Sequence, residues 1–233
     1  MSAALCEQGY VMTPWIAECI DMPLVPQRSE EWFELRKSRI TGSVVDTILG
    51  NNPYGDYDQL VCEKAGMPVA FKGNDATAHG TKYEPVAIEE YCRVTGRHVV
   101  ELGLTPHRSC TMLAHSPDGI SLSKASDPVL LEIKCPLRRV IKPNQVPPYY
   151  MAQLQMGMEL FDLHAAHFVQ FKPEPPEFDI TVVPREEGWL ARHMPALEKF
   201  WEDVQRWQAT GWQEHPKFMV RGGVEYFKSV CVL

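Results

Sequence analysis

The chain lacks the paired cysteines that would cross-link a small secreted domain or hold a zinc ion. Its seven cysteines are odd in number, scattered along the 233 residues and without any C-x-x-C pair. This pattern excludes a disulfide framework and a zinc ribbon, and it is typical of a reducing compartment. Iron–sulfur cluster spacing is missing too. We therefore expect an intracellular protein, in the cytoplasm or nucleus of a host cell.

Long hydrophobic runs and a surplus of positive charge are missing as well. No run of about 18 apolar residues exists, so no membrane span or membrane partner is expected. The first residues lack the basic segment and apolar core of a signal peptide. The net charge of −7 gives no sign of a nucleic-acid partner, whose usual footprint is basic. Hydrophobic residues make up 45% of the chain, which is enough for a real core.

No internal repeat or low-complexity linker divides the chain, so we expect a single domain. Residues 27–208 form the predicted core, and residues 209–233 form a predicted C-terminal tail. Residues 1–26 carry Pro14, Pro23 and Pro26, and we expect them to be an irregular N-terminal arm.

Hydrophobic periodicity predicts helices and strands within the core. A helix capped by Ser29 is expected to end at Thr41-Gly42-Ser43, and Pro85 predicts a kink or a late start in a later helix. Further helices are expected at residues 43–49, 76–94, 147–163 and 186–208, and strands at residues 98–102, 111–114, 119–122, 129–134, 165–173 and 177–184. A mixed β-sheet flanked by helices, of the α/β or α+β class, is the simplest packing of these elements.

Two charged residues interrupt the apolar strand predicted at residues 129–134. Glu132 and Lys134 share one face of this strand because alternate side chains do. A lone buried carboxylate is costly, and a metal ion shared with a second carboxylate removes that cost. Asp118, in a Pro-Asp-Gly turn, can supply it, and hard oxygen ligands select Mg²⁺ or Mn²⁺ over zinc. Lys134 could then orient or help to deprotonate water that attacks a phosphate.

A plainer interpretation of the same residues is structural. Glu132 and Lys134 could form a solvated pair on a half-exposed strand, and Pro-Asp-Gly could be an ordinary turn.

Four segments, in order, resemble one known family. They are "EEWFELRKSRITGS", "HGTKYEPVAIEEY", "AHSPDGI" with "LLEIKCP", and "YYMAQLQMGMEL". Together they resemble the PD-(D/E)xK nuclease superfamily and, within it, the lambda-exonuclease branch of YqaJ-type viral recombinase nucleases, which is related to herpesvirus alkaline nucleases. The resemblance covers about residues 28–171 and implies a restriction-endonuclease-like core. Four ordered blocks are far more specific than one motif.

The resemblance implies roles for the acids and the lysine. Asp118, Glu132 and the backbone carbonyl of Ile133 resemble metal ligands, and Lys134 resembles the residue that positions the water. Glu84 resembles a further acid that helps to hold a second ion. Alternatively, Glu84 caps a helix that begins at Pro85.

The resemblance also implies a pocket for a terminal 5′-phosphate. Arg36 and Ser43 match its motif, with Ser116 and Gln153 nearby and Gln155 as the second choice for the glutamine. Each has a structural alternative: a solvated Arg36, Ser43 as a helix N-cap, and Gln153 bonded to backbone.

Basic residues gather in two places despite the acidic total. Residues 133–158 contain no Asp or Glu, and the loop after the catalytic strand carries Arg138, Arg139 and Lys142. Arg36, Lys37 and Arg39 make a second cluster. We expect these residues to contact DNA phosphates, and the alternative is a solvated basic loop.

The resemblance implies a Mg²⁺-dependent deoxyribonuclease, with two ions and Mn²⁺ as a substitute. It implies digestion of the 5′-ended strand of linear double-stranded DNA from its end, which releases mononucleotides and leaves a 3′ overhang for a single-strand annealing protein. The alternatives are an endonuclease or broad nuclease of the same superfamily, and a non-catalytic module that binds DNA ends. Both a homo-trimer and a monomer remain open.

Overall fold

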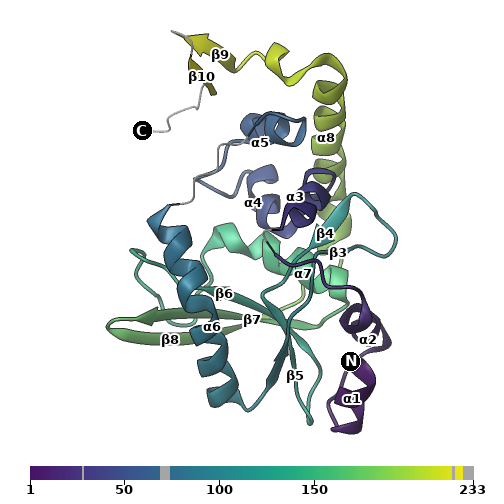
Figure 1. The fold of residues 1–233 in the computed structure, drawn as a ribbon, viewed down its shortest axis with the longest axis vertical. Coiled ribbons are helices and arrows are strands. Elements are labelled where there is room, and N and C mark those ends of the chain that lie inside the picture. The colour runs from purple at the N-terminus through teal and green to yellow at the C-terminus, as the bar shows by residue number, and fades with distance from the viewer. Residues whose placement is uncertain (28, 69–73, 222–223, 228–233) are drawn as a thin grey trace.

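A mixed five-stranded sheet lies in the lower part of the molecule as drawn in Figure 1, below a layer of helices. The computed structural model describes residues 1–27, 29–68, 74–221 and 224–227. The strand order is β2-β5-β6-β7-β8. β6 and β7 run parallel with Glu132 opposite Phe168, and the other neighbours are antiparallel. The strands are β2 (His98–Val100), β5 (Gly119–Leu122), β6 (Val129–Lys134), β7 (Ala165–Pro173) and β8 (Pro176–Pro184).

Two helices cover opposite faces of β6. α6 (Asp75–Thr95) packs Tyr91 against Leu131 and Ile133 in one apolar cluster. α7 (Met151–Phe161), preceded by the 3₁₀ turn η1 (Pro148–Tyr150), packs Leu154 against Leu130 in another. Successive β6 side chains therefore alternate between the two helices, as a strand requires. The predicted central sheet with flanking helices is confirmed.

α7 is buried on all sides because a second group of helices packs against it. Their shared apolar cluster contains Met156 of α7, Val45 of α4 (Gly42–Ile48), Val61 of α5 (Tyr57–Lys64) and Leu197 of α8 (Trp189–Thr210). A three-stranded sheet of β1 (Ile40–Thr41), β4 (Leu113–His115) and β3 (Thr105–Pro106) joins this layer. α7 thus belongs to two cores at once, and this fixes the side chains that it carries.

Pro85 neither kinks the chain into two helices nor starts one. α6 begins ten residues earlier, at Asp75, where Asn74 caps it, and it runs unbroken to Thr95. Glu84 therefore lies inside α6, and its interpretation as a helix cap is wrong. α5 was not predicted, because its eight residues carry little amphipathic pattern. β1 and β3 have two residues each, which is too short for a periodicity.

The prediction of an irregular N-terminal arm is wrong. Residues 1–26 contain α1 (Ser2–Glu7) and α2 (Pro14–Asp21). Thr13 caps α2 and Pro14 occupies its first position, where a proline favours a helix. The Trp15 Nε1 atom donates to the Leu160 carbonyl at 2.9 Å, and Ile16 is fully buried in the cluster that contains α7.

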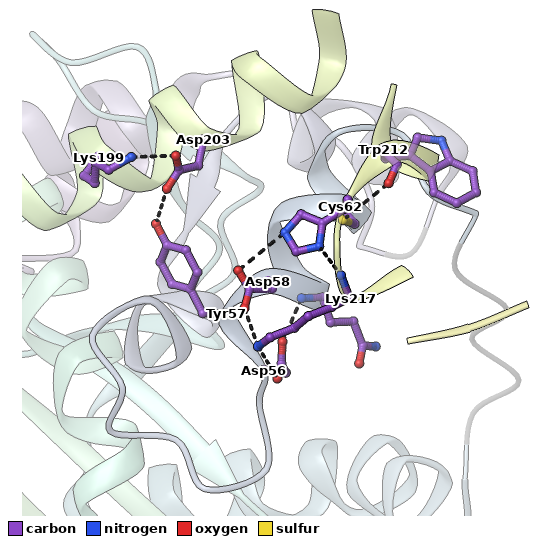
Figure 2. Close-up of polar contacts among 10 residues, drawn as sticks. Asp56, Tyr57, Asp58, Cys62, Lys199, Asp203, Trp212 and Lys217 are labelled. Carbon is purple, nitrogen blue, oxygen red and sulfur yellow. Dashed lines mark hydrogen bonds and ion pairs between the residues drawn. The ribbon is translucent and has the colours of Figure 1, made fainter. Parts of the chain in front are cut away.

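The C-terminal segment is fastened to α5. It contains η2 (Trp212–Glu214) and the hairpin of β9 (Phe218–Arg221) and β10 (Val224–Phe227). Lys217 forms ion pairs with Asp56 and Asp58, and on the other side Tyr57 donates to Asp203 of α8 at 3.0 Å (Figure 2). α5 is thereby bonded to both α8 and the C-terminal segment. Part of the predicted tail, residues 228–233 with Lys228 and the seventh cysteine, Cys231, lies outside the described residues.

Six cysteines lie in the described part of the chain, from Cys6 to Cys135, and all six are free thiols there. In the part of the chain that the structure describes, no helix is long and apolar enough to cross a membrane.

Replacing Ile16 with alanine tests whether the N-terminal helices belong to the core. Ile16 is 0% exposed, so Ile16→Ala should lower the free energy of unfolding by about 2–5 kcal/mol in urea titrations. Val182→Ala, at a position 60% exposed on β8, is the matched control and should change it by less than about 0.5 kcal/mol. Equal effects of the two variants would mean that α2 contributes no core packing.

Candidate active site

Glu132 is a buried carboxylate that two side chains hold from one side. It is 1% exposed, and its Oε1 atom accepts hydrogen bonds from Lys134 Nζ at 2.5 Å and from Gln153 Nε2 at 2.6 Å. Its Oε2 atom is buried and has no hydrogen-bond partner within the described part of the chain. The interpretation of Glu132 and Lys134 as a solvated pair is therefore wrong, because this carboxylate is inside the protein.

Asp118 and Glu84 lie beside this carboxylate. The Asp118 Oδ2 atom accepts a hydrogen bond from the backbone nitrogen of Ile133 at 2.6 Å, which ties the Pro-Asp-Gly turn to β6. Glu84 reaches the same place from α6. Glu84, Asp118, Ile133 and Lys134 line one cavity of about 490 Å³ between α6 and the end of β6. The structure thus brings together the predicted acids and the predicted lysine.

The charges of these groups act on one another. Burial, with smaller contributions from the charges of Asp118 and Glu84, raises the pKa of Glu132 to about 7, although Lys134 acts in the opposite direction. Burial alone would lower the pKa of Lys134, but Glu132 and Asp118 raise it above its ordinary value. An ammonium group held by two carboxylates stays protonated, and it compensates only part of the negative charge gathered here.

The oxygen atoms of this site suit a hard cation, although the site contains no ready-made cluster of metal ligands among the described residues. Among the described residues, no group of three or more His, Cys, Asp or Glu side chains is arranged to hold a metal ion. The Glu132 Oε2 atom nevertheless has no protein partner in that part of the chain, and a buried oxygen of this kind costs free energy unless something binds it. Carboxylate and carbonyl oxygens suit Mg²⁺ or Mn²⁺. Asp118, Glu132 and the Ile133 carbonyl are therefore the residues that would hold an ion.

Arg36 and Ser43 meet, as predicted. Arg36, on α3 (Glu30–Lys37), donates from Nη2 to Ser43 Oγ at 2.7 Å and lies over the Trp32 ring at 4.3 Å from its centroid. Burial lowers the pKa of Arg36 to about 10, which leaves the guanidinium charged at neutral pH. Arg36 is thus no freely solvated residue. Ser43 is no N-cap either, because α4 begins at Gly42 and Thr41 holds the cap position.

Lys64, at the end of α5, fixes the end of α3. Its Nζ atom donates to the carbonyl oxygens of Arg36, in the last turn of α3, at 2.5 Å and of Arg39, just after the helix, at 2.7 Å. Burial and the charge of Arg36 lower the pKa of Lys64 to about 7. The sequence pattern missed this residue, because its contacts cross 28 positions and depend on the packing of α5.

Gln153 is placed by a buried aspartate. Asp46 of α4 is 2% exposed and accepts hydrogen bonds from the backbone nitrogens of Ala152 and Gln153, at the start of α7. The Gln153 side chain is thereby directed to Glu132 and not to backbone. Gln155, the second choice, does not reach the site. Its amide bonds the Pro184 carbonyl and the Glu186 nitrogen, so its hydrogen-bonding atoms serve the fold.

His115, at the end of β4, lies where three elements approach closely, and Ser116 follows it in the chain. The His115 ring is buried between Gly42 and Gly157, and a Cβ atom on Gly42 would lie 2.1 Å from its Nδ1 atom. Burial lowers the pKa of His115 to about 3, so the ring is neutral. The Ser116 hydroxyl is buried and, like both His115 ring nitrogens, has no hydrogen-bond partner among the residues described. These unpartnered polar atoms distinguish this side of the site from an ordinary core.

The basic loop after β6 lies at the site, and the second basic cluster lies there only in part. Arg138 and Lys142 are exposed, and Arg139 donates to Gln170 Oε1 at 2.6 Å, which anchors the loop to β7. In the second cluster, Lys37 pairs with Glu34 and Arg39 donates to the Leu35 carbonyl of its own helix. Arg36 is the member of that cluster that reaches Ser43.

Residues 31–162 match the YqaJ-like viral recombinase domain. The chain belongs to this family. The match covers more than half of the 233 residues and includes Arg36, Glu84, Asp118, Glu132 and Gln153, so the predicted family is confirmed.

Solved structures and viral proteins extend the comparison. LHK-Exo, an alkaline exonuclease from Laribacter hongkongensis, is 26% identical with a TM-score of 0.64, over 78% of this chain and 95% of that one. A protein of African swine fever virus (strain Badajoz 1971 Vero-adapted) is 32% identical over 164 residues, which are 58% of this chain and 46% of the relative. A protein of Acanthamoeba polyphaga mimivirus is 29% identical over 65% of this chain and 30% of the relative. The chain spans less than half the length of these viral relatives.

The pH dependence of stability should reveal Lys64. With a pKa near 7 when folded and about 10.4 when unfolded, Lys64 binds more protons in the unfolded state between these values. The free energy of unfolding of the natural chain, minus that of Lys64→Met, should therefore rise from pH 7 to pH 9.5 in urea titrations. Lys37→Met is the matched control for loss of a surface ammonium group. A difference that falls with pH would contradict the burial of Lys64.

Proposed function

We propose that the chain is a metal-dependent 5′-to-3′ exodeoxyribonuclease that digests one strand of linear double-stranded DNA from its end. The single observation that carries this proposal is the state of the Glu132 carboxylate. Its Oε1 atom accepts hydrogen bonds from Lys134 and Gln153, and its Oε2 atom is buried with no hydrogen-bond partner among the described residues. Membership of the viral recombinase family and the similarity to an alkaline exonuclease support it. The products would be mononucleotides and a 3′ overhang for an annealing protein.

Each residue of the site has a separate task in this reaction. A divalent cation, Mg²⁺ or Mn²⁺, when bound, would lower the pKa of water and stabilise negative charge on the phosphate. Asp118 and Glu132 would hold it, and Glu84 lines the same cavity from α6. Lys134, kept protonated by the acids around it, would orient the attacking water and stabilise the charge that develops on the phosphoryl oxygens. Gln153 holds Glu132 in place.

The 5′ polarity of the proposal rests on Arg36 and Ser43. A partly buried guanidinium that is bonded to a serine hydroxyl offers donors for the oxygens of a terminal phosphate. Ser116, whose hydroxyl has no partner within the described residues, is a further donor. The solved complex of LHK-Exo with dAMP, which resembles this chain with 27% identity and a TM-score of 0.65, supports a nucleotide monophosphate as product.

Two other functions remain as alternatives. An endonuclease of the same superfamily would share Asp118, Glu132 and Lys134 but would have no use for a pocket for a terminal phosphate. A non-catalytic module that binds DNA ends would not need a buried carboxylate, which costs stability in the absence of an ion. The contact between Arg36 and Ser43 and the burial of Glu132 therefore favour the exonuclease.

Metal removal and substitution of Lys134 should abolish cleavage. On an end-labelled linear duplex with Mg²⁺, Lys134→Ala should lower the rate about 100-fold to 10,000-fold, because the attacking water loses its positioning group. Excess EDTA should stop the reaction. Gln155→Ala, on the same helix but bonded away from the site, is the control and should retain most activity. Undiminished cleavage by Lys134→Ala would remove the proposed mechanism.

Comparing duplexes with a phosphate or a hydroxyl at the 5′ end tests the proposed 5′-to-3′ direction of digestion. A duplex with 5′-phosphates should be digested faster than one with 5′-hydroxyls, and Arg36→Met should reduce that preference by about 10-fold to 100-fold, since a hydrogen bond to a charged group contributes about 1.5–3 kcal/mol. Lys37→Met should leave the preference unchanged, because Lys37 pairs with Glu34. A closed circular plasmid should stay intact, and its linearisation by the protein would favour the endonuclease.

A further inference from the structure

A second cavity, of about 920 Å³, opens beside the candidate active site. Its walls come from the turn after α4, the start of α6, the loop after β6 and the start of α7. Arg139 and Tyr150 line both this groove and the cavity of the acids. Ser43 and Gln153 also line the groove, so it reaches from the proposed phosphate pocket to the proposed site of cleavage.

Three tyrosines form a row along the groove. Tyr54 lies at the solvent end, 83% exposed, with its ring centroid 5.6 Å from that of Tyr149 in an edge-to-face arrangement. Tyr149 lies 4.6 Å from Tyr150, and the Lys134 ammonium lies 5.0 Å over the Tyr150 ring. The row therefore leads from solvent to the lysine of the candidate active site.

The turn that carries Tyr54 is held in place. The Tyr54 backbone nitrogen donates to Asn52 Oδ1 at 3.0 Å, and Asn52 Nδ2 donates to Thr47 of α4 at 3.0 Å. Gly55 passes so close to Thr47 that a Cβ atom there would lie 2.3 Å from its hydroxyl oxygen. Because this backbone is fixed, binding a ligand to the exposed ring costs less conformational entropy than it would on a mobile loop.

The charges in the groove suit a phosphate backbone. Arg138 and Arg139 lie in its wall, Lys142 is exposed on the same loop, and Asp75 is the acid among the lining residues. Exposed aromatic rings beside cations are the usual means by which proteins bind single-stranded nucleic acid, since bases stack on the rings and cations neutralise phosphates.

We propose that this groove binds unpaired DNA nucleotides, with a base stacked on Tyr54 and the backbone phosphates beside Arg138. This inference rests on the proposed function, because it takes the acids and Lys134 as the site of cleavage. A strand separated from its duplex would be held with its bases on the tyrosine row while its end reaches Arg36 and Ser43. The groove would then favour strands with bases free to stack.

The test measures binding without cleavage. The full chain in EDTA is titrated with a fluorescent 5′-phosphorylated single-stranded DNA 10-mer and with the same oligonucleotide in which abasic sites replace the first three bases. Tyr54→Ala should weaken binding of the normal oligonucleotide by about 5-fold to 100-fold, and Tyr54→Phe should retain binding because it keeps the ring. Neither variant should weaken binding of the abasic oligonucleotide further. Val182→Ala, which also removes exposed apolar surface, should bind as the natural chain does.

Other outcomes overturn the proposal. Equal loss of affinity for both oligonucleotides on Tyr54→Ala would show that Tyr54 does not contact a base. A change in mass by light scattering on Tyr54→Ala would identify the tyrosine as a contact between copies of this chain. Failure of this proposal can be distinguished from failure of the proposed function. If Lys134→Ala still cleaves, the mechanism fails, but the binding titrations of the Tyr54 variants still show whether the groove binds bases. If Tyr54→Ala binds normally, the groove fails while metal-dependent cleavage stands.

Discussion

A single carboxylate, buried in the sheet, is the constraint on which the rest of this structure depends. Glu132 lies among apolar strands, where an isolated charge would be costly, and the protein supplies it with Lys134 on the same strand and Gln153 on the covering helix. Both side chains donate to the Oε1 atom, whereas the buried Oε2 atom has no hydrogen-bond partner among the residues that the structure describes. The core is therefore organised around a group that lowers its stability, which is typical of residues kept for chemistry.

Polar contacts between the surrounding helices hold the side chains of the candidate active site in place. Asp46 fixes the start of α7 and hence Gln153, and Lys64 fixes the end of α3 and hence Arg36. α5, which carries Lys64, is in turn bonded to α8 and to the C-terminal segment (Figure 2). The groups proposed to bind metal and phosphate are thus held by buried and partly buried polar contacts between helices.

The features visible in the sequence were those with short-range causes. β5, β6 and β7 begin and end where hydrophobic periodicity placed them. Motif spacing brought Asp118 and Lys134 to one cavity, and Lys134 bonds Glu132. The errors have physical reasons too. Prolines at residues 1–26 suggested irregular chain, but Pro14 occupies the helix position that tolerates it. Lys64 and the contact of Tyr54 with Tyr149 could not be predicted, because they arise only when distant elements pack.

The alternation along β6 also restricts how such a chain can diverge. Glu132 faces α7, while Leu131 and Ile133 face α6, so the functional surface and one of the cores share a single backbone register. Insertion or deletion of one residue in this strand would exchange the two sets and place aliphatic groups against Gln153. A two-residue change would preserve the assignment of faces. Descendants of this fold can accordingly vary the size of the α6-facing side chains far more freely than they can vary the length of this strand.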